Sequence, residues 1–141
     1  MGYEIKYITA KTEMLCQLPL LQQLQPWLNE KNMSEMLDDM LPHGYVMAGV
    51  FDGNKCVAIT GLWFITKFYS GKYMEIDNFV TDENYRSKGL GKLLTDWCMA
   101  EAKNKNCRTV MLDAYTTNHA GHKFYLREGF IIKGYHFLKE I

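Results

Sequence analysis

The chain has 141 residues, of which 48% are hydrophobic and 23% charged, and its formal net charge at pH 7 is zero. This length suits one domain with its own core, so we expect a single domain over residues 1–141. The balanced charge gives no reason to expect binding to nucleic acid or to an anionic membrane. No run approaches 18 apolar residues and residues 1–6 lack a signal-peptide pattern, so we expect a cytoplasmic protein without a membrane span.

The four cysteines are scattered along the chain, and no two of them form a C-x-x-C pair. Their spacing is typical of reduced, mostly buried thiols, because nothing around them would activate a nucleophile. They are Cys16, Cys56, Cys98 and Cys107.

The first third of the chain predicts a strand followed by helices. Residues 3–9 are a short strand candidate, and residues 12–28 carry leucines at helical spacing. Pro19 falls inside this pattern and is expected to split or kink the helix. Asn32, three residues before Glu35, resembles a capping box that opens another short helix.

Three strands are predicted next, over residues 45–51, 55–69 and 73–81. The first two are joined by Asp52-Gly53-Asn54, a strong hairpin signal. Together they predict an antiparallel meander.

A glycine-containing basic turn, residues 86–91, joins the strand at 73–81 to the clearest helix of the sequence. Apolar residues follow the turn at helical spacing, as expected for a helix lying on a sheet. They are Leu90, Leu93, Leu94, Trp97 and Cys98. A helix N-terminus has backbone N–H groups without intrahelical partners and a partial positive charge, and glycines leave room for a ligand to reach them. The turn therefore predicts an anion-binding site.

The last third alternates strand and helix. Residues 109–112 form a short apolar run that suits a strand buried on both faces. Residues 118–128 predict a helix ended by Gly129, and residues 130–139 predict one strand or a pair of short strands. The whole order predicts an α/β layer architecture with a mixed sheet.

The strand at 73–81 carries two carboxylates on one face. With a period of two, Glu75 and Asp77 point the same way, together with Tyr73 and Phe79. The opposite face is expected to hold Met74, Ile76, Asn78 and Val80. A solvated face is the plain interpretation. The same strand leads into the anion-binding turn, however, which favours a functional one.

Two motifs together resemble those of the GNAT superfamily of acyl-CoA-dependent N-acetyltransferases. The first is Arg86-x-x-Gly89-x-Gly91 after a strand. The second begins at Asn118 and continues through Phe124, Tyr125, Gly129 and Phe130. The resemblance covers roughly residues 45–139. In this family the stretch at about 12–42 is the variable part that shapes the acceptor site, and proline often stands where this chain has Asp82.

The resemblance implies a mixed, mostly antiparallel sheet of about six to seven strands flanked by about four helices and splayed at its central strands. It also implies acetyl-CoA as co-substrate, with its pyrophosphate at the basic turn and its pantetheine arm along the strand, and no metal. The cofactor-binding residues it implies are Phe79, Val80, Thr81, Arg86, Ser87, Lys88, Gly89, Leu90, Gly91, Lys92, Asn118 and Tyr125.

The implied reaction is direct acetyl transfer to a primary amine in a ternary complex. A substrate ammonium must lose a proton, and Glu75, eleven residues before Arg86, matches a catalytic glutamate of the family's histone-type members. Asp77 is the competing base, with ordered water as a third choice. Tyr125 matches the family tyrosine that protonates the leaving thiolate. The acceptor is a small-molecule or peptide amine.

Other interpretations stay open or fit less well. A non-catalytic acyl-CoA-binding or sensor module is the alternative function, and a nucleic-acid module built on residues 86–88 is a third. The turn lacks the third glycine of a dinucleotide fingerprint and the Ser/Thr of a P-loop. His119 and His122 lack further metal ligands nearby in the sequence. Only twelve residues follow Gly129, so a homodimer in which a neighbouring subunit completes that edge stays open.

Overall fold

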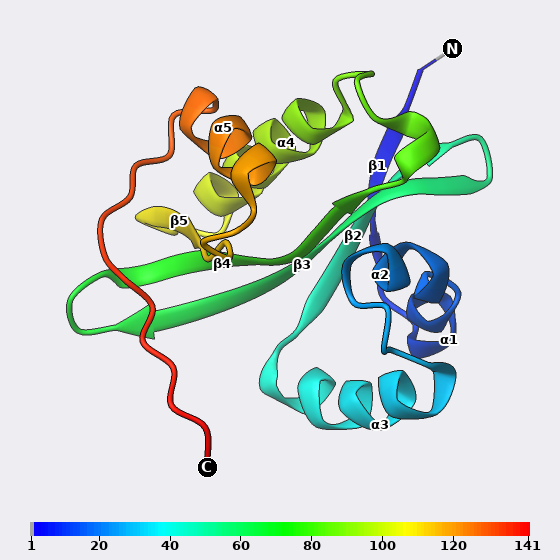
Figure 1. Cartoon of the computed structure of the whole chain (residues 1–141), viewed down its shortest axis with the longest axis horizontal. Coiled ribbons are helices and arrows are strands. Elements are labelled where there is room, and N and C mark those ends of the chain that lie inside the picture. Colours follow the sequence, from blue (N-terminus) through cyan, green and yellow to red (C-terminus); the bar gives the residue numbers. More distant parts are fainter. Residues whose placement is uncertain (1) are drawn as a thin grey trace. The chain divides into compact units, whose positions relative to one another are not determined.

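The computed structural model describes residues 2–141 and divides into two compact units, one ending at Met111 and one covering residues 112–141. The first unit is a layered α/β structure in which helices cover both faces of a sheet (Figure 1). The second unit contains one helix and the C-terminal segment.

The sheet has five strands in the order β1-β2-β3-β4-β5. Neighbours among the first four strands are antiparallel, which confirms the predicted meander. The connection from β4 to β5 runs through a helix, as a crossover in a mixed sheet requires. The strands are β1 (Glu4–Ile8), β2 (Val46–Asp52), β3 (Lys55–Lys67), β4 (Gly71–Thr81) and β5 (Thr109–Leu112).

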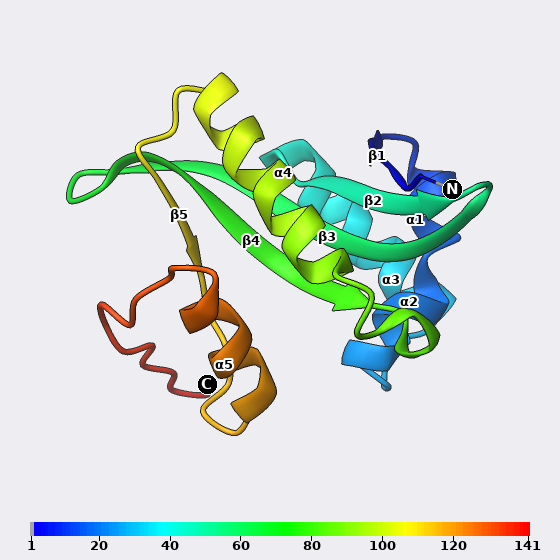
Figure 2. The ribbon, with the colours of Figure 1, turned by 90° about the horizontal axis from the view of Figure 1, so that it is seen from above.

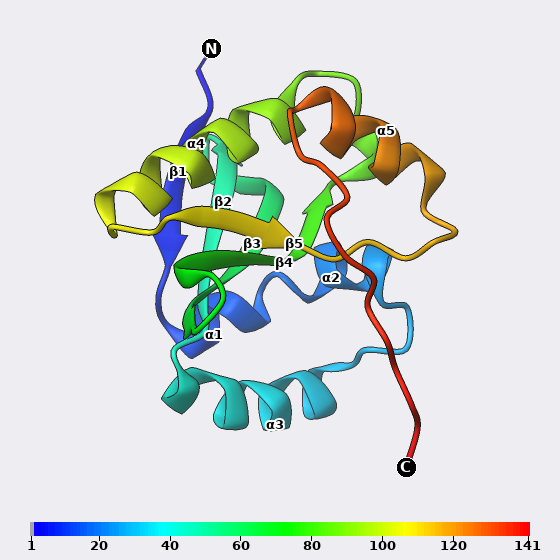
Figure 3. The same cartoon turned by 90° about the vertical axis from the view of Figure 1, so that its left-hand side faces the viewer.

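Three helices lie on one face of the sheet and a longer helix lies on the other (Figures 1 and 3). The first face carries α1 (Lys11–Leu15), α2 (Leu18–Leu24) and α3 (Glu30–Met40). The second face carries α4 (Leu90–Asn104), which crosses β2, β3 and β4 (Figure 2). Pro19 stands in the first turn of α2, so the predicted split of the leucine-rich helix is confirmed.

Each face has its own hydrophobic core. Ile59 and Val80 pack with α1–α3, whereas Val57 and Ala58 pack with α4. The buried residues that the helices contribute are Met14, Leu20, Leu21, Met33 and Leu37 on the first face, and Leu90, Leu94, Thr95, Cys98 and Ala102 on the second. The predicted apolar stripe of α4 is therefore confirmed except at Leu93, which is 40% exposed.

The start of α3 differs from the prediction. Its N-cap is Asn29, whose side chain accepts from the Asn32 backbone N–H at 2.9 Å. The Asn32 side chain in turn accepts from the Asn29 N–H at 2.8 Å. The predicted box from Asn32 to Glu35 is wrong, because asparagine serves here as both members of the box one turn earlier.

A β-bulge interrupts the β3–β4 pairing. Ile59 pairs with Val80 and Gly61 with Asp77, so that Asn78 and Phe79 together stand opposite Thr60. Asn78 adopts the left-handed region with φ 38°, which asparagine tolerates better than most residues. The bulge shifts the strand's alternation: Phe79 packs on the α4 core and Val80 on the α1–α3 core. The predicted facing of these two residues is wrong for this reason.

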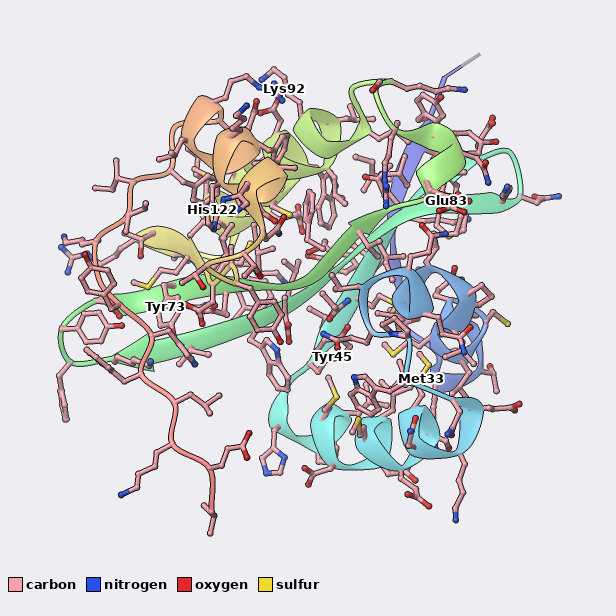
Figure 4. All side chains as sticks on the ribbon, viewed as in Figure 1. Met33, Tyr45, Tyr73, Glu83, Lys92 and His122 are labelled. Carbon is pink, nitrogen blue, oxygen red and sulfur yellow. The ribbon has the colours of Figure 1, made fainter. Side chains whose placement is uncertain are left out.

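The bulge is held from the β2 side by Tyr45, which is 4% exposed and lies between the sheet and α3 near Met33 (Figure 4). The Tyr45 hydroxyl donates to Asn78 Oδ1 at 2.9 Å. Gly61 leaves room for this bond, because a Cβ there would overlap Asn78 Oδ1 and lie 2.6 Å from the Tyr45 hydroxyl.

The element count also corrects the prediction. The described residues form five strands and five α-helices rather than six to seven strands and four helices. Residues 130–141 form no strand, so the predicted strand or pair of short strands over residues 130–139 is wrong. β5 is only partly buried, and its expected burial on both faces is wrong.

Replacing Gly61 by alanine is expected to destabilise the protein through the bulge. The added methyl group must displace the Tyr45 hydroxyl or the Asn78 amide, so we expect a loss of about 1–3 kcal/mol in the free energy of unfolding. Urea denaturation measures it. Gly2→Ala is the matched control, since nothing lies within 4 Å of a Cβ there. Equal stability of the two variants would show that the bulge does not depend on the missing side chain.

Candidate functional site

The predicted anion site is the N-terminus of α4. Gly89 is its N-cap, with φ 76° and no side-chain capping bond. Ser87 also has a left-handed backbone, with φ 63°. The Leu93 N–H bonds to the Gly89 carbonyl at 3.0 Å, so the N–H groups ahead of it have no intrahelical partner. The mouth of this 15-residue helix, by which we mean its N-terminal turn at residues 86–92, has no side-chain capping bond and is therefore well suited to an anion.

The basic side chains around this mouth are held to different degrees. Lys88 Nζ lies 4.8 Å from the centre of the Tyr85 ring, whose hydroxyl donates to Asp52 at 3.0 Å. Lys92 pairs with Asp96 at 3.1 Å, so part of its charge is already compensated. Lys88 is therefore the better candidate to reach a bound anion.

Asp82, which is 7% exposed, holds the segment between β4 and the mouth of α4 in place. Its carboxylate accepts from the Asn84 N–H at 3.0 Å and pairs with Lys55 at 3.7 Å. Its own N–H donates to the Val57 carbonyl at 2.8 Å. The Asn84 N–H bond is the main reason why the pKa of Asp82 lies below its ordinary value.

A second contact ties the same segment to α2. The Glu83 N–H, in the short 3-10 helix Glu83–Tyr85, donates to Gln23 Oε1 at 3.0 Å. Glu83 lies at the end of the sheet beside α2 (Figure 4). No local pattern predicts a role for Gln23, because this bond joins residues 60 positions apart.

The two carboxylates of β4 lie on the face that α1–α3 cover. Glu75 is opposite Trp63 and Asp77 is opposite Gly61, so both point to the side of Ile59 and Tyr45. Asp77 is exposed and accepts from Trp63 Nε1 at 3.0 Å.

The end of β4 extends beyond its neighbour β5. The Arg108 N–H, just before β5, donates to the Lys72 carbonyl at 2.8 Å, so β5 starts near the beginning of β4. Because β5 has only four residues, it ends before Phe79. On the other side, Val80 and Thr81 are paired with β3. The predicted backbone groups at Phe79–Thr81 therefore stand on a stretch whose outer edge β5 does not reach.

The predicted residues of the second unit lie on α5 (His119–Arg127). Asn118 caps this helix, and its Oδ1 accepts from the Gly121 N–H at 3.0 Å. Tyr125 is partly buried, and its ring contacts Phe124 and Phe130 at centroid distances of 5.3 and 5.8 Å. Gly129 has φ 96°, so the predicted glycine end of the helix is confirmed.

A single strand-to-helix junction of the first unit thus carries four of the predicted features in chain order. They are Glu75, Asp77, the Phe79–Thr81 backbone and the Arg86–Lys92 mouth. Asn118 and Tyr125 belong to the second unit. Sequence reasoning missed Tyr45 and Trp63. The predicted turn at residues 70–72 would have placed Trp63 opposite Phe79, whereas the observed pairing of Lys67 with Gly71 places it opposite Glu75.

Of the four cysteines only Cys98 is buried, so the prediction of mostly buried thiols is wrong. Burial raises the pKa of Cys98 to about 12 and that of Cys56 to about 11, so both thiols stay protonated at neutral pH. Within residues 2–141 no three His, Cys, Asp or Glu side chains are grouped to hold a metal ion. No helix in that range is both long and apolar enough to span a bilayer.

A cavity of about 330 Å³ lies elsewhere, between the first helices and the β2–β3 hairpin. Cys16, Leu20 and Lys55 are among the residues that line it, and none of the predicted site residues does. The junction after β4 therefore remains the candidate site.

A sequence model of the acetyltransferase (GNAT) family matches residues 12–130. The chain is 25% identical over 139 residues to the uncharacterised N-acetyltransferase YhdJ of Bacillus subtilis, covering 97% of this chain and 98% of that protein. A putative acetyltransferase from Agrobacterium tumefaciens is 26% identical, with a TM-score of 0.81 over 98% of this chain and 99% of that one. AAC(6')-Iy, solved in complex with the bisubstrate analogue CoA-S-monomethyl-acetylneamine, is 16% identical, with a TM-score of 0.85 over 100% of this chain and 99% of that one.

Replacing Asp82 by asparagine is expected to weaken the entry to the mouth. The amide keeps an oxygen for the Asn84 N–H but loses the charge, so the free energy of unfolding at pH 7 should fall by about 1 kcal/mol. Because the folded pKa of Asp82 is lowered, the carboxylate stabilises the protein above the unfolded value of 3.8, and this contribution is lost as the pH falls through the folded pKa.

Urea denaturation between about pH 7 and pH 3 measures this difference. The two proteins should approach equal stability at the acid end. Asp38→Asn is the control, because Asp38 pairs with Lys11 at an exposed position. A gap between wild type and Asp82→Asn that stays constant with pH would contradict a role for the charge.

Proposed function

The chain belongs to the acetyltransferase (GNAT) family. We therefore propose that it moves the acetyl group of acetyl-CoA to a primary amine, by direct transfer in a ternary complex. We also propose that residues 1–141 act as a single domain. The family match over residues 12–130 is the observation that carries this proposal. The uncapped mouth of α4 supports it, since the pyrophosphate of coenzyme A is an anion of the kind that such a mouth binds.

In this proposal the cofactor is held by the β4–α4 junction. Amides of Ser87 to Lys92 take the pyrophosphate, and Arg86 and Lys88 add positive charge. The pantetheine arm pairs with the backbone of Phe79, Val80 and Thr81, a stretch that β5 is too short to cover. Asn118 contributes from α5 through its amide nitrogen, because its oxygen caps the helix.

The amine must become neutral before it attacks, since only about one molecule in a thousand is a free amine at pH 7 if its pKa is near 10. Glu75 is proposed as the base, with Asp77 or an ordered water as the alternative. The amine nitrogen then bonds to the thioester carbon and the carbon–sulfur bond breaks. A backbone N–H near Phe79 or Val80 steadies the carbonyl oxygen.

The remaining step is protonation of the leaving thiolate. The substrate ammonium loses two protons during the reaction, and the leaving thiolate takes up one. Tyr125 is proposed as its donor, on the strength of the family motif at positions 118–130. No covalent intermediate on the protein is needed, which agrees with the raised pKa of Cys98 and Cys56.

Assaying the protein with acetyl-CoA and a panel of amines tests the proposed activity directly. Purified protein should release free thiol from acetyl-CoA only when a suitable primary amine is present, and mass spectrometry should find the acetylated amine. Monoamines, diamines, polyamines and lysine peptides make up the panel. Binding of acetyl-CoA without turnover of any amine would instead support the non-catalytic acyl-CoA-binding module.

Replacing Tyr125 by phenylalanine is expected to lower kcat by roughly 100-fold with little change in the affinity for acetyl-CoA. The ring and its contacts with Phe124 and Phe130 remain, and only the proton donor is lost. Steady-state kinetics and calorimetry measure the two effects. Tyr135→Phe, at a position 86% exposed, is the matched control. Full turnover in the Tyr125 variant would remove this residue as the acid.

A further inference from the structure

The face of β4 that is proposed to meet the acceptor carries two carboxylates. Glu75 and Asp77 point to the same side, and the strand rise places their Cα atoms roughly 7 Å apart. Within residues 2–141 no ion pair joins Asp77 to a lysine, arginine or histidine. Asp77 is also exposed.

The Asp77 carboxylate is oriented by two neutral donors. Trp63 Nε1 donates to Oδ2 at 3.0 Å, and the Asn78 backbone N–H donates to Oδ1 at 2.8 Å. Each oxygen is thereby fixed in position, while the negative charge stays uncompensated. A carboxylate in this state is prepared to hold a cation.

Trp63 is itself fixed from behind. The buried Tyr45 ring lies 5.2 Å from the Trp63 ring, centroid to centroid, at an angle of 58°. The position of Tyr45 is fixed in turn by the hydrogen bond that its hydroxyl donates to Asn78 Oδ1. Trp63 remains partly exposed next to Asp77. An indole beside a carboxylate is a surface that attracts ammonium groups through both the charge and the π face.

We propose that the acceptor is a linear diamine or polyamine, with one ammonium group held by Asp77 beside Trp63 and another facing Glu75. The inference rests on the proposed acetyl transfer and names the substrate class for it. A spacing of roughly 7 Å between the two residues along the strand suits ammonium groups separated by about four or five methylenes. Asp77 is then a specificity residue that binds one cationic end of the acceptor.

The ratio of kcat/KM for butane-1,4-diamine to that for butylamine isolates this contact. Loss of a base, or partial misfolding, lowers the rate with both amines alike and leaves the ratio unchanged. We expect the wild type to prefer the diamine by about tenfold or more. Asp77→Asn keeps an acceptor for the Trp63 N–H but removes the charge, so the preference should fall by about tenfold.

Two further variants complete the comparison. Trp63→Phe keeps a ring against Tyr45 but frees Asp77, and should lower the preference by a smaller factor. Asp38→Asn, on α3 and paired with Lys11, should keep it. A wild type that does not prefer the diamine, an Asp77→Asn variant that retains the preference, or better turnover of a lysine peptide would each overturn the proposal.

Direct binding separates this proposal from the enzymatic one. Calorimetry with butane-1,4-diamine, in the presence and absence of coenzyme A, should show binding to the wild type and at least about tenfold weaker binding to Asp77→Asn. If no amine is acetylated, the proposed activity fails, yet this binding difference still supports the subsite. Absence of diamine binding to the wild type under both conditions overturns the subsite.

Discussion

One extra residue in β4 organises the first unit. At the bulge, Asn78 and Phe79 share a single partner position on β3, so the strand's two faces exchange roles at that point. Before the bulge, the α1–α3 face carries the polar pair Glu75 and Asp77. After it, the same face carries Val80 and is closed by the core. The boundary between a polar surface and a packed interior thus falls at a backbone irregularity, held in place by Tyr45 and by the missing side chain of Gly61.

The segment after the bulge is fixed independently at both of its sides. Asp82 bonds to the β3 backbone and to its own turn, and Glu83 bonds to α2 through Gln23. These contacts fix where the chain turns into Ser87 and Gly89, whose left-handed backbones lead into the first turn of α4. An anion site made of backbone groups depends on such anchoring, since no charged side chain can move to correct a misplaced amide. The same segment explains how Asp82 serves at a turn where proline would fix the backbone by its ring, for Asp82 adopts φ −51°.

Periodicity was enough to locate the elements, because it reflects burial along a regular helix or strand. It found the meander, α4 and the split at Pro19. Periodicity failed where one extra residue shifts the alternation of the strand. Nothing local in the sequence around Asn78 predicts a bulge, because its partners Tyr45 and Gly61 lie far away along the chain. The C-terminal strand failed for a different reason. Residues 130–141 have the composition of a strand, but a strand exists only where another offers its backbone groups. The roles of Glu75, Arg86 and Tyr125 stay predictions drawn from the motifs.

The zero net charge of the chain conceals a local separation of charge along β4. In the proposed function the strand meets two ligands of opposite sign: a cationic amine at Glu75 and Asp77, and an anionic pyrophosphate at the mouth beyond Arg86. About ten residues of chain separate the carboxylates from the mouth. At physiological ionic strength the Debye length is about 8 Å, so the charges at one region are largely screened from the ligand at the other. Were the carboxylates nearer to the mouth, they would repel the cofactor that the glycines admit. The bulge lies between the two regions, where the proposed transfer requires neither charge but a backbone N–H for the thioester oxygen.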